Sequence, residues 1–504
     1  RSAMNPSLIE LPIVARAGGH ARRTALVTPE GTFTYAQLLD ASARVAAALL
    51  DGAADLHEAR VAFLAPPGWD YVAVQWGIWR AGGIAVPLAV SHPPAELEYV
   101  VQDADTAIVL AHPDFAEALR PIAHRDGRRF VMTPDALAAE PAVLPSVDEA
   151  RRAMIVYTSG TTGRPKGVVS THANLRAQIT SLVRAWAWTA EDRTLLVLPL
   201  HHVHGIVNVL ACALWSGAAC EILPRFDADE TWRAVESGRL TLFMAVPTVY
   251  GRLIAAYDGA EPERRARMSA GCAGLRLMVS GSAALPVRTL ERWRQISGHV
   301  LLERYGMTEI GMALGNPLHG ERRPGFVGVP LPGVQARLVD EDGAEVEPGT
   351  PGEVEIRGAT VFLEYWRRPE ATAEAFRDGW FRTGDVGVVE DGYVRLLGRR
   401  SVDIIKTGGF KVSALEIEEV LRTHPEIGEC AVVGVDDAEW GERVCVAAET
   451  AADSPLTLEA LQAWAREHLA PYKLPRALRR VEALPRNAMG KVVKPEVAKL
   501  FAEP

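Results

Sequence analysis

Short apolar runs alternate with stretches of helical apolar spacing over much of the chain before Gly328. Runs such as Arg60–Leu64 and Ile84–Leu88 are typical of buried strands, because consecutive apolar residues are bounded by turn residues. Between such runs, Tyr35–Leu50 carries apolar residues at helical spacing, with Thr34 or a neighbour as its N-cap. The other elements that we expect here are strands over Thr24–Val27, Thr32–Thr34, Ala107–Leu110, Ala153–Val156, Thr194–Pro199, Thr241–Val246 and Leu275–Val279, and helices over Asp70–Arg80 and Pro94–Ala104. This alternation predicts an α/β fold of doubly wound parallel sheets, which bind ligands at the C-terminal ends of their strands.

The pattern changes around Gly328, where short apolar runs are joined by glycine, proline and acidic turns. These runs, Val334–Val339, Gly352–Arg357 and Gly392–Leu397, predict a small β-rich subdomain. A junction at Gly398–Asp403 is followed by a unit with its own strands and helices. We therefore expect a large N-terminal domain over residues 1–398, a hinge over 399–403 and a smaller, mobile α+β C-terminal domain over 404–504.

Composition narrows the class of protein. A chain of 504 residues, 48% of them apolar, is long enough for two or more domains with a substantial core. A net charge of −9 argues against nucleic acid as a main partner, which requires a basic face. The cysteines are scattered without C-x-x-C or zinc-site spacing, so we expect buried, reduced thiols.

The longest apolar stretch, Tyr71–Val90, is interrupted by Arg80, Gly82, Gly83 and Pro87. We therefore expect no membrane-spanning helix. The first residues show no signal-peptide pattern, which favours a cytoplasmic protein, although an organellar form whose leader has been removed stays open. The sequence does not predict an oligomeric state.

The loop Tyr157–Gly167, Tyr-Thr-Ser-Gly-Thr-Thr-Gly-Arg-Pro-Lys-Gly, predicts a phosphate site. Its glycines let backbone N–H groups approach a ligand closely, and its hydroxyls and lysine add donors suited to phosphate. The loop is no Walker A motif, because Pro165 stands where the second glycine belongs and Gly167 follows Lys166. The alternative is a flexible surface loop, which the preceding apolar strand disfavours.

Two further stretches suit a nucleotide. The small residues of Ser280–Ala284 follow a strand and leave room for a flat ring. Arg304–Glu309 offers an aromatic ring for stacking, a hydroxyl for phosphate and a carboxylate able to hold Mg²⁺. The alternative for Arg304–Glu309 is a capping box at a helix start. A third stretch, Trp380–Asp385, places an acid after a tight glycine turn, and by itself it would be an ordinary turn.

These motifs, with Pro485–Val492 near the C-terminus, resemble in content and order those of the adenylate-forming enzymes: acyl-CoA synthetases, luciferases and adenylation domains of peptide synthetases. The resemblance runs from about Arg22 to the C-terminus. It implies that a carboxylic acid attacks the α-phosphate of MgATP to give acyl-AMP and pyrophosphate. A nucleophile then takes the acyl group, and a rotation of the C-terminal domain separates the two steps.

The resemblance also implies site residues. Lys491, Thr308 and Glu309 would be catalytic, with Lys491 meeting the carboxylate and the α-phosphate and Glu309 holding Mg²⁺. Asp385 and Arg399 would hold the ribose. The residues implied in ATP binding are Thr158, Ser159, Gly160, Thr161, Thr162, Gly163, Lys166, Gly281, Ser282, Ala283, Arg304, Tyr305, Gly306, Met307, Asp385 and Arg399. The chain departs from the family at the hinge, where Ser401 replaces the usual Asp or Lys, which leaves the hinge residue open.

The acceptor of the acyl group is also implied by resemblance. Gly408, Gly409, Phe410 and Lys411 are similar to the loop that lines the pantetheine tunnel of acyl-CoA synthetases. No carrier domain follows in the chain, as it would in a peptide synthetase. Coenzyme A is therefore the expected acceptor.

The identity of the acid substrate is indicated by residues at and after the predicted strands Thr194–Pro199 and Thr241–Val246. Leu198–Gly205 contains three histidines, but they lack the spacing and the acidic or thiol neighbours of a zinc site. A histidine and Arg252 favour a second, anionic end on the substrate over an apolar tunnel. The sequence around these residues, together with Arg304–Ala313 and Arg322–Gly325, resembles that of malonyl-CoA synthetases. It is particularly similar to the animal mitochondrial type that also accepts methylmalonate. By that resemblance, the distal carboxylate is bound by His204, Arg252 and Arg322.

The sequence thus predicts an acid–CoA ligase that makes malonyl-CoA, AMP and pyrophosphate from malonate, CoA and ATP. One alternative is a short- or medium-chain fatty acyl-CoA synthetase whose histidine and arginine are structural. Another is a nucleotide- or CoA-binding regulator without turnover, which the presence of Lys166, Glu309, Asp385 and Lys491 disfavours.

Overall fold

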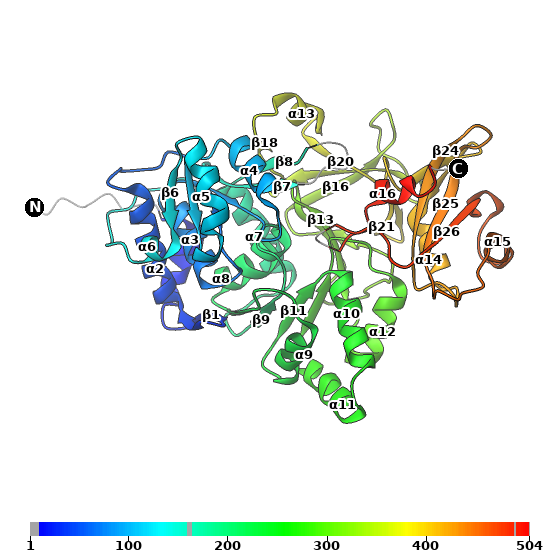
Figure 1. The fold of residues 1–504 in the computed structure, drawn as a ribbon, viewed down its shortest axis with the longest axis horizontal. Helices are drawn as coiled ribbons and strands as arrows, with labels where there is room; N and C mark the ends of the chain where they lie inside the picture. The colour runs from blue at the N-terminus through cyan, green and yellow to red at the C-terminus, as the bar shows by residue number, and fades with distance from the viewer. Residues whose placement is uncertain (1–9, 159–163, 488–489, 503–504) are drawn as a thin grey trace, which may run out of the picture.

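The computed structural model of the chain describes residues 10–158, 164–487 and 490–502. Two large sheets flanked by helices form the N-terminal part, and a β-rich subdomain and a smaller C-terminal unit complete the molecule (Figure 1). We use the name C-terminal unit for the described residues from 404 onward. The predicted fold class is confirmed.

The first large sheet has the strand order β18-β8-β7-β4-β3-β5-β6. Its central strands β7, β4, β3, β5 and β6 are parallel, while β8 and β18 are added antiparallel at one edge. The strands are β3 (Arg60–Leu64), β4 (Ile84–Pro87), β5 (Ile108–Ala111), β6 (Arg129–Met132), β7 (Arg152–Thr158), β8 (Lys166–Thr171) and β18 (Glu364–Tyr365). Their near-continuous burial is expected of parallel strands covered on both faces.

The second large sheet has the order β15-β14-β13-β12-β11-β9-β10-β1-β2. The strands from β1 to β13 along this path run parallel, whereas β2, β14 and β15 pair antiparallel with their neighbours at the two ends. They are β1 (Thr24–Thr28), β2 (Gly31–Thr34), β9 (Arg193–Leu196), β10 (Ala219–Ile222), β11 (Leu242–Ala245), β12 (Leu277–Ser280), β13 (Leu302–Met307), β14 (Gly311–Gly315) and β15 (Val329–Pro330).

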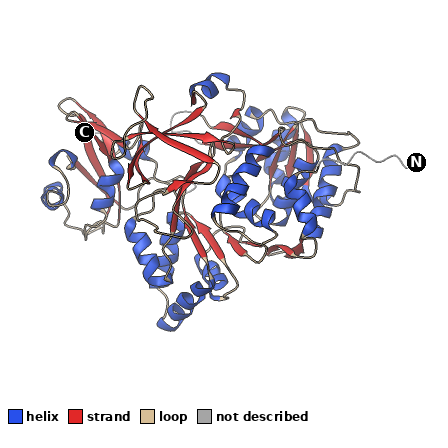
Figure 2. Ribbon diagram, turned by 180° about the vertical axis from the view of Figure 1, so that it is seen from behind, coloured by secondary structure: helices blue, strands red, loops and turns tan. Residues whose placement is uncertain are grey.

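Helices lie against both faces of these sheets, as the view from behind makes clear (Figure 2). They are α1 (Pro12–Gly19), α2 (Tyr35–Leu50), α3 (Trp69–Arg80), α4 (Pro94–Asp103), α5 (Ala116–Arg125), α6 (Thr133–Leu137), α7 (His172–Ala185), α8 (Cys212–Ser216), α9 (Ala228–Glu236), α10 (Pro247–Asp258), α11 (Pro262–Gly271), α12 (Val287–Ser297) and α13 (Pro369–Glu374). Short helical turns are η1 (Pro113–Phe115), η3 (Cys272–Gly274) and η4 (Pro471–Lys473), and η2 (His204–Ala211) is a π-helix. The predicted cap of α2 is confirmed, because the Thr34 hydroxyl accepts a hydrogen bond from the Gln37 N–H at 3.2 Å.

The β-rich subdomain and the C-terminal unit each contain a sheet of their own. The subdomain comprises β16 (Val334–Val339), β17 (Gly352–Gly358), β19 (Phe376–Arg377), β20 (Trp380–Glu390) and β21 (Tyr393–Arg399). The C-terminal unit comprises β22 (Ile404–Thr407), β23 (Phe410–Ser413), α14 (Ala414–Leu421), β24 (Glu429–Asp437), β25 (Gly441–Glu449), α15 (Leu458–Ala465), β26 (Ala477–Val481) and α16 (Lys494–Lys499). Its hydrophobic core is separate from that of the N-terminal part.

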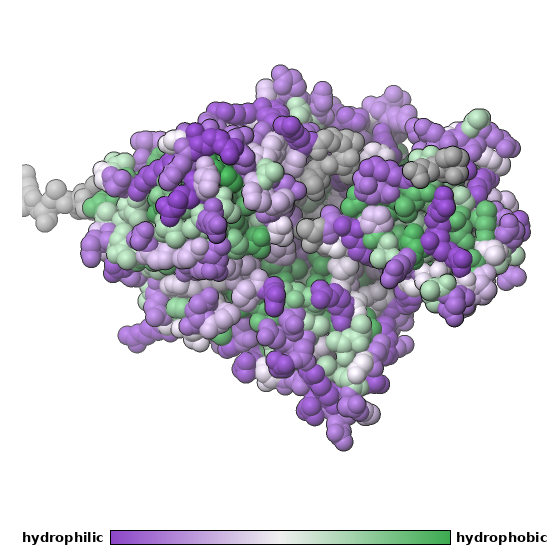
Figure 3. Space-filling model, in the orientation of Figure 1, coloured by the Kyte–Doolittle hydropathy of each residue, from purple (hydrophilic) through white to green (hydrophobic). Residues whose placement is uncertain are grey.

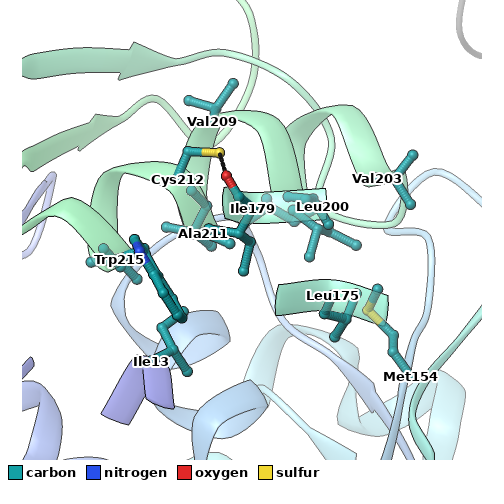
Figure 4. Packing of buried hydrophobic residues seen from close by; sticks show 14 of the residues in the cluster. Ile13, Met154, Leu175, Ile179, Leu200, Val203, Val209, Ala211, Cys212 and Trp215 are labelled. Carbon is teal, nitrogen blue, oxygen red and sulfur yellow. Dashed lines mark hydrogen bonds between the residues drawn. The ribbon is translucent and has the colours of Figure 1, made fainter. Parts of the chain in front are cut away.

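The main core lies where α7, α8 and η2 pack between the sheets (Figure 4). The thiol of Cys212 contacts the Ile179 carbonyl at 3.9 Å in this layer, and burial raises its pKa well above the ordinary thiol value. Each of the cysteines is buried and free, as the sequence predicted. On the face drawn in Figure 3, hydrophilic residues cover the outer rim and the projecting α11.

The segment after the phosphate loop is extended as β8, and α7 begins at His172 with Thr171 as its cap. His204 begins the π-helix η2. Among the described helices, none is long and apolar enough to cross a membrane.

Candidate active site

The predicted residues converge where β12 and β13 end. Gly281 directly follows β12, and the guanidinium of Arg304 lies against it, since a Cβ at position 281 would come 2.4 Å from Arg304 Cζ. The next residue, Ser282, has φ +71°, a left-handed conformation that is strained for serine. Its hydroxyl lies 3.2 Å from Nδ1 of His204 and accepts a longer bond, at 3.4 Å, from Nη2 of Arg304. Ser282, after β12, and Arg304, in β13, therefore lie close to His204, although the three residues are far apart in the sequence.

Arg304 is a buried cation with no counter-ion among the residues that the structure describes. Its side chain is 2% exposed, and within the described residues it forms no ion pair and its Nε has no hydrogen-bond partner. Burial lowers its pKa to about 9. A buried charge is costly unless it is paired, so this geometry is suited to an anionic ligand.

His204 borders this cation, and His202 lies two positions before it in the chain. Burial lowers the pKa of His204 well below its ordinary value, and the positive charge of Arg304 adds to the effect. Burial lowers the pKa of His202 in the same way. Both rings are therefore neutral at neutral pH, and in each of them Nε2 has no partner within the described part of the chain. In that part, no three His, Cys, Asp or Glu side chains are arranged to hold a metal ion.

The residues Arg304, Ser282 and His204 are the first cluster of the site. A second cluster consists of Tyr305, Asp385 and Arg399. The Tyr305 hydroxyl donates to Oδ2 of Asp385 at 2.5 Å, and Nε of Arg399 donates to Oδ1 at 3.1 Å. The Asp385 N–H donates to the Thr383 hydroxyl at 3.0 Å, which fixes the acid after its glycine turn. A carboxylate held in this way can accept hydrogen bonds from a diol such as ribose.

A third cluster joins Lys166 to Glu309 through Tyr365. Nζ of Lys166 lies 5.1 Å from the centroid of the Tyr365 ring, and the Tyr365 hydroxyl donates to Oε1 of Glu309 at 2.9 Å. Burial raises the pKa of Glu309, and the Tyr365 hydroxyl opposes this effect. Mg²⁺ is commonly held by one or two carboxylates together with substrate phosphates, so Glu309 fits the cation and Lys166 fits the phosphates.

The predicted phosphate loop is only partly described. Thr158, at the end of β7, faces Lys166 at the start of β8 across an antiparallel pair. The predicted residues Ser159, Gly160, Thr161, Thr162 and Gly163 lie outside the described residues. The pairing places the two ends of the loop side by side.

The C-terminal unit brings Lys491 to the first two clusters. Lys491 is exposed, yet partial desolvation by the surrounding protein lowers its pKa, and the positive charges of Arg304 and Arg399 lower it further, whereas Asp385 opposes them. The lysine loop folds against α10, since a Cβ at Gly490 would lie 3.4 Å from the Thr248 side chain. In Figure 1 this segment, coloured red, runs back from the C-terminal unit to the centre of the molecule.

The remaining motif residues complete the turn after β13. Thr308 is half-buried between β13 and β14, and Met307 precedes it. Gly306 lies against the opposite backbone, because a Cβ there would come 2.2 Å from the Gly311 carbonyl oxygen. Ala283 is exposed beside Ser282. The stretch forms a strand and a turn, so the capping-box alternative for residues 304–309 is rejected.

The two arginines predicted with His204 for the distal carboxylate, Arg252 and Arg322, differ in their contacts. Arg322 donates to the carbonyl oxygens of Pro317, Val300 and Leu318 at 3.2, 2.7 and 3.0 Å. Its guanidinium is therefore engaged by the backbone and unsuited to a substrate carboxylate. Arg252 is exposed, and its Cζ lies 4.8 Å from the centroid of the Phe226 ring.

The predicted CoA residues lie on the hairpin β22–β23. Gly408 and Gly409 adopt φ +55° and +83°, and the Gly408 N–H donates to the Trp440 carbonyl at 2.8 Å. Phe410 is exposed and stacks on Tyr472, with ring centroids 4.2 Å apart. Lys411 pairs with Glu341 at 2.9 Å. These contacts involve none of the three clusters.

Sequence reasoning missed two supports of the site. Tyr365 lies on the two-residue edge strand β18, with no local motif to mark it. Lys494, three positions after Lys491, pairs with Asp403 at 2.5 Å and with Glu418 at 2.7 Å. The only sign of Lys494 in the sequence is its position close to Lys491. The fold is needed to show that it connects the lysine loop with Asp403 of the predicted hinge.

Glu303, the neighbour of Arg304 in β13, is a buried acid. Its Oε1 accepts from the Leu285 N–H at 3.1 Å, while Oε2 has no partner among the described residues. Burial raises its pKa to about 8, the Leu285 N–H opposes this effect, and the carboxylate of Glu419 adds to it. The side chain is therefore held as a neutral acid at neutral pH.

Replacing Glu303 by Gln should stabilise the protein at neutral and alkaline pH. Because the pKa is higher in the folded state than its ordinary 4.5, stability present below that value is lost as the pH rises through about 8. A pKa that differs by one between the folded and the unfolded protein corresponds to about 1.4 kcal/mol. Thermal unfolding from about pH 5 to about pH 9 should show a Tm advantage of Glu303→Gln that grows with pH and then levels off. A pH-independent difference would contradict this.

Two family models match separate parts of the chain. The model of the AMP-binding enzyme family matches residues 13–366, and that of the AMP-binding enzyme C-terminal domain matches residues 416–491. The mitochondrial malonate–CoA ligase of Homo sapiens is 47% identical, over 97% of this chain and 92% of that protein. The malonate–CoA ligase of Arabidopsis thaliana is 40% identical, over 99% and 90%.

Solved structures agree with this. ATP-bound MatB from Rhodopseudomonas palustris superposes with a TM-score of 0.91 at 34% identity, covering 98% of this chain and 99% of that one. The o-succinylbenzoate CoA synthetase of Bacillus subtilis, in complex with its acyl-adenylate, gives a TM-score of 0.85 at 26% identity and covers 97% of both chains. With the nucleotide-suited clusters described above, these matches show that the chain belongs to the AMP-binding enzyme family.

Proposed function

We propose that this protein is an AMP-forming acid–CoA ligase that converts malonate or methylmalonate, ATP and CoA to the acyl-CoA, AMP and pyrophosphate. The observation that carries the choice of acid is the buried guanidinium of Arg304, which has no ion-pair partner in the described part of the chain and lies beside His204 and Ser282. A dicarboxylate brings a second anion that a fatty acid lacks. The relatives named malonate–CoA ligase and the ATP-bound MatB structure support the same reaction.

In the first half-reaction, a carboxylate oxygen of the acid attacks the α-phosphorus and pyrophosphate leaves. The acid is ionised at neutral pH, so the step requires neutralisation of crowded negative charge more than a general base. Lys491 supplies an ammonium at this point, next to Arg304 and Arg399. We assign Thr308 to the α-phosphate as well.

The other ATP contacts follow from the clusters. We assign the ribose to Asp385 and Arg399, the adenine to the Tyr305 ring and the Gly281–Ala283 segment, and the outer phosphates to the loop around Lys166. Mg²⁺ bound at Glu309 would neutralise phosphate charge. Tyr365 holds the Glu309 carboxylate in place by the hydrogen bond from its hydroxyl.

We assign the distal carboxylate of the acid to Arg304, with His204 and Ser282 as its hydrogen-bonding neighbours. Arg252 remains a second candidate, with a smaller expected effect because an exposed guanidinium is screened by water. The second half-reaction transfers the acyl group to the CoA thiol. We assign Gly408, Gly409, Phe410 and Lys411 to CoA, which requires the C-terminal unit to rotate after adenylation.

The same proposal includes the division of the chain. Residues 1–398 and 404–504 are proposed as domains, with residues 399–403 as the hinge. A cytoplasmic location stays a prediction, and the animal relatives named mitochondrial make an organellar location its rival.

The reaction is tested by release of pyrophosphate and formation of acyl-CoA with a panel of mono- and dicarboxylates. Malonate and methylmalonate should give the highest kcat/KM, with CoA required for the thioester product. Preference for butyrate or longer fatty acids would favour the alternative of a short- or medium-chain fatty acyl-CoA synthetase. Nucleotide binding without pyrophosphate release would indicate a binding-only protein.

Tyr365→Phe should weaken the use of magnesium. Without the donor hydroxyl, the buried Glu309 carboxylate loses a partner that favours its ionised form. The magnesium concentration for half-maximal pyrophosphate release should rise about tenfold, with little change in the KM for malonate. Tyr393→Phe is the matched control, because that hydroxyl binds the Glu321 carbonyl at the exposed surface. An unchanged magnesium dependence would remove Tyr365 from this role.

A further inference from the structure

Two charged side chains connect α12 of the N-terminal part with α14 of the C-terminal unit. Oε1 of Glu419, on α14, accepts from the N–H of Val287, the first residue of α12, at 3.0 Å. In the opposite direction, Arg288 on α12 donates to the carbonyl oxygens of Arg422 and Gly428 at 3.2 and 2.8 Å. Each unit thus reaches into a helix end or a turn of the other.

These contacts satisfy groups that the helices leave open. α12 begins after Pro286, and no side chain of its own segment caps its N–H groups. The Glu419 carboxylate is therefore placed at the unsatisfied, partly positive start of α12. Arg422 is the C-cap of α14, so the guanidinium of Arg288 meets the partly negative end of that helix. The charges of both contacts complement the helix dipoles.

The contacts lie next to the site. Leu285, two positions before Val287, donates to Glu303, the strand neighbour of Arg304, and the segment Gly281–Ala283 ends two positions before Leu285. Glu419 belongs to the same unit as Lys491. A movement of the C-terminal unit that broke these contacts would therefore also move Lys491 relative to Arg304.

Other links between the two parts differ in kind. Lys411 and Glu341 form an ion pair whose side chains are largely exposed, and such pairs contribute little. Arg395 and Glu416 pair at 2.8 Å close to the predicted hinge, where a rotation displaces atoms least. The α12–α14 contacts involve backbone groups of both parts away from the hinge.

We propose that Glu419 and Arg288 form a latch that holds the C-terminal unit in the orientation that places Lys491 in the site. This inference rests on the proposed function, and it makes both side chains positioning residues for the activation of the acid. Neither side chain touches a reacting atom. The latch favours the adenylate-forming half-reaction and has to open before the hairpin β22–β23 can serve the second one.

The test separates the two half-reactions. Malonate-dependent exchange between ATP and pyrophosphate measures adenylation, and CoA thioester formation from supplied malonyl-AMP measures transfer. Glu419→Ala and Arg288→Ala should each lower the exchange rate about tenfold while transfer is kept or becomes faster. The double variant should lose little more than either single one, because each change opens the same latch.

Controls separate positioning from damage to the fold. Arg292 is a half-buried arginine on the same helix that pairs with Asp258, and Arg292→Ala should leave both half-reactions unchanged. Arg288→Lys, which keeps one donor, should retain part of the exchange rate. Equal loss in both half-reactions, or exchange no lower than that of Arg292→Ala, would overturn the latch. Absence of malonate-dependent exchange in the unaltered protein would instead overturn the proposed function. If one single variant does not fold, the other decides.

Discussion

Lys491→Ala is expected to lower the rate of acyl-adenylate formation about a thousandfold while thioester formation from supplied malonyl-AMP stays nearly unchanged. The α-phosphate, the incoming carboxylate and the departing pyrophosphate are all anionic, and Lys491 is the cation that the C-terminal unit brings to Arg304 and Arg399. Its environment lowers its pKa, so its ammonium is less stable there until anions arrive. A charge placed in this way stabilises the crowded transition state more than the free enzyme.

Lys499→Ala is the matched control for this prediction. Lys499 lies in the same C-terminal segment, is exposed and pairs only with Glu496 among the described residues. Its loss removes one positive charge from the unit without touching the site, and both half-reactions should be kept. If Lys491→Ala lowers both half-reactions to the same extent, the lysine acts through the fold or through CoA binding.

The strands and the order of the motifs could be predicted because they depend on local patterns. Residues 60–64 form the predicted strand in the structure, and residues 35–50 form the predicted helix with its Thr34 cap. The partners within the site could not be predicted, because they depend on which faces meet. Tyr305 and Asp385 are distant in sequence, and only the fold shows that their side chains share a hydrogen bond.

Arg304 shows the limit most clearly. A motif places Arg304 and Tyr305 together, but successive side chains of a strand point to opposite faces. In the structure Tyr305 contacts Asp385, while Arg304 lies against Gly281 near Ser282 and His204. Their adjacent positions in a strand imply opposite faces, but neither residue type nor spacing reveals which residues each side chain contacts there. The same reasoning applies to Arg322, whose engagement with backbone carbonyls has no sequence signal.

Arg304→Met is expected to remove the preference for a dicarboxylate. The KM for malonate should rise about a hundredfold, because a buried, charge-assisted pair with the distal carboxylate is lost. The KM for butyrate should change little, since butyrate has no second anion to bind. Methionine is similar in length to the apolar part of arginine, so packing against Gly281 is largely kept.

The stability of the ligand-free protein provides an independent measurement for the same substitution. An unpaired buried guanidinium is costly, so Arg304→Met should keep or raise the Tm in the absence of substrate. Malonate should then raise the Tm of the unaltered protein but no longer that of the variant, because only the first binds it.

Arg252→Ala is the comparison that decides between the two arginines. Because Arg252 is exposed over Phe226, its loss should raise the KM for malonate by a smaller factor than Arg304→Met. A larger effect at Arg252 would move the distal carboxylate toward α10 and Phe226. A rise in the KM for ATP with unchanged selectivity in Arg304→Met would return Arg304 to the nucleotide. A selective loss of malonate at Arg304 alone would assign the recognition of the acid to the buried cation between Gly281 and His204.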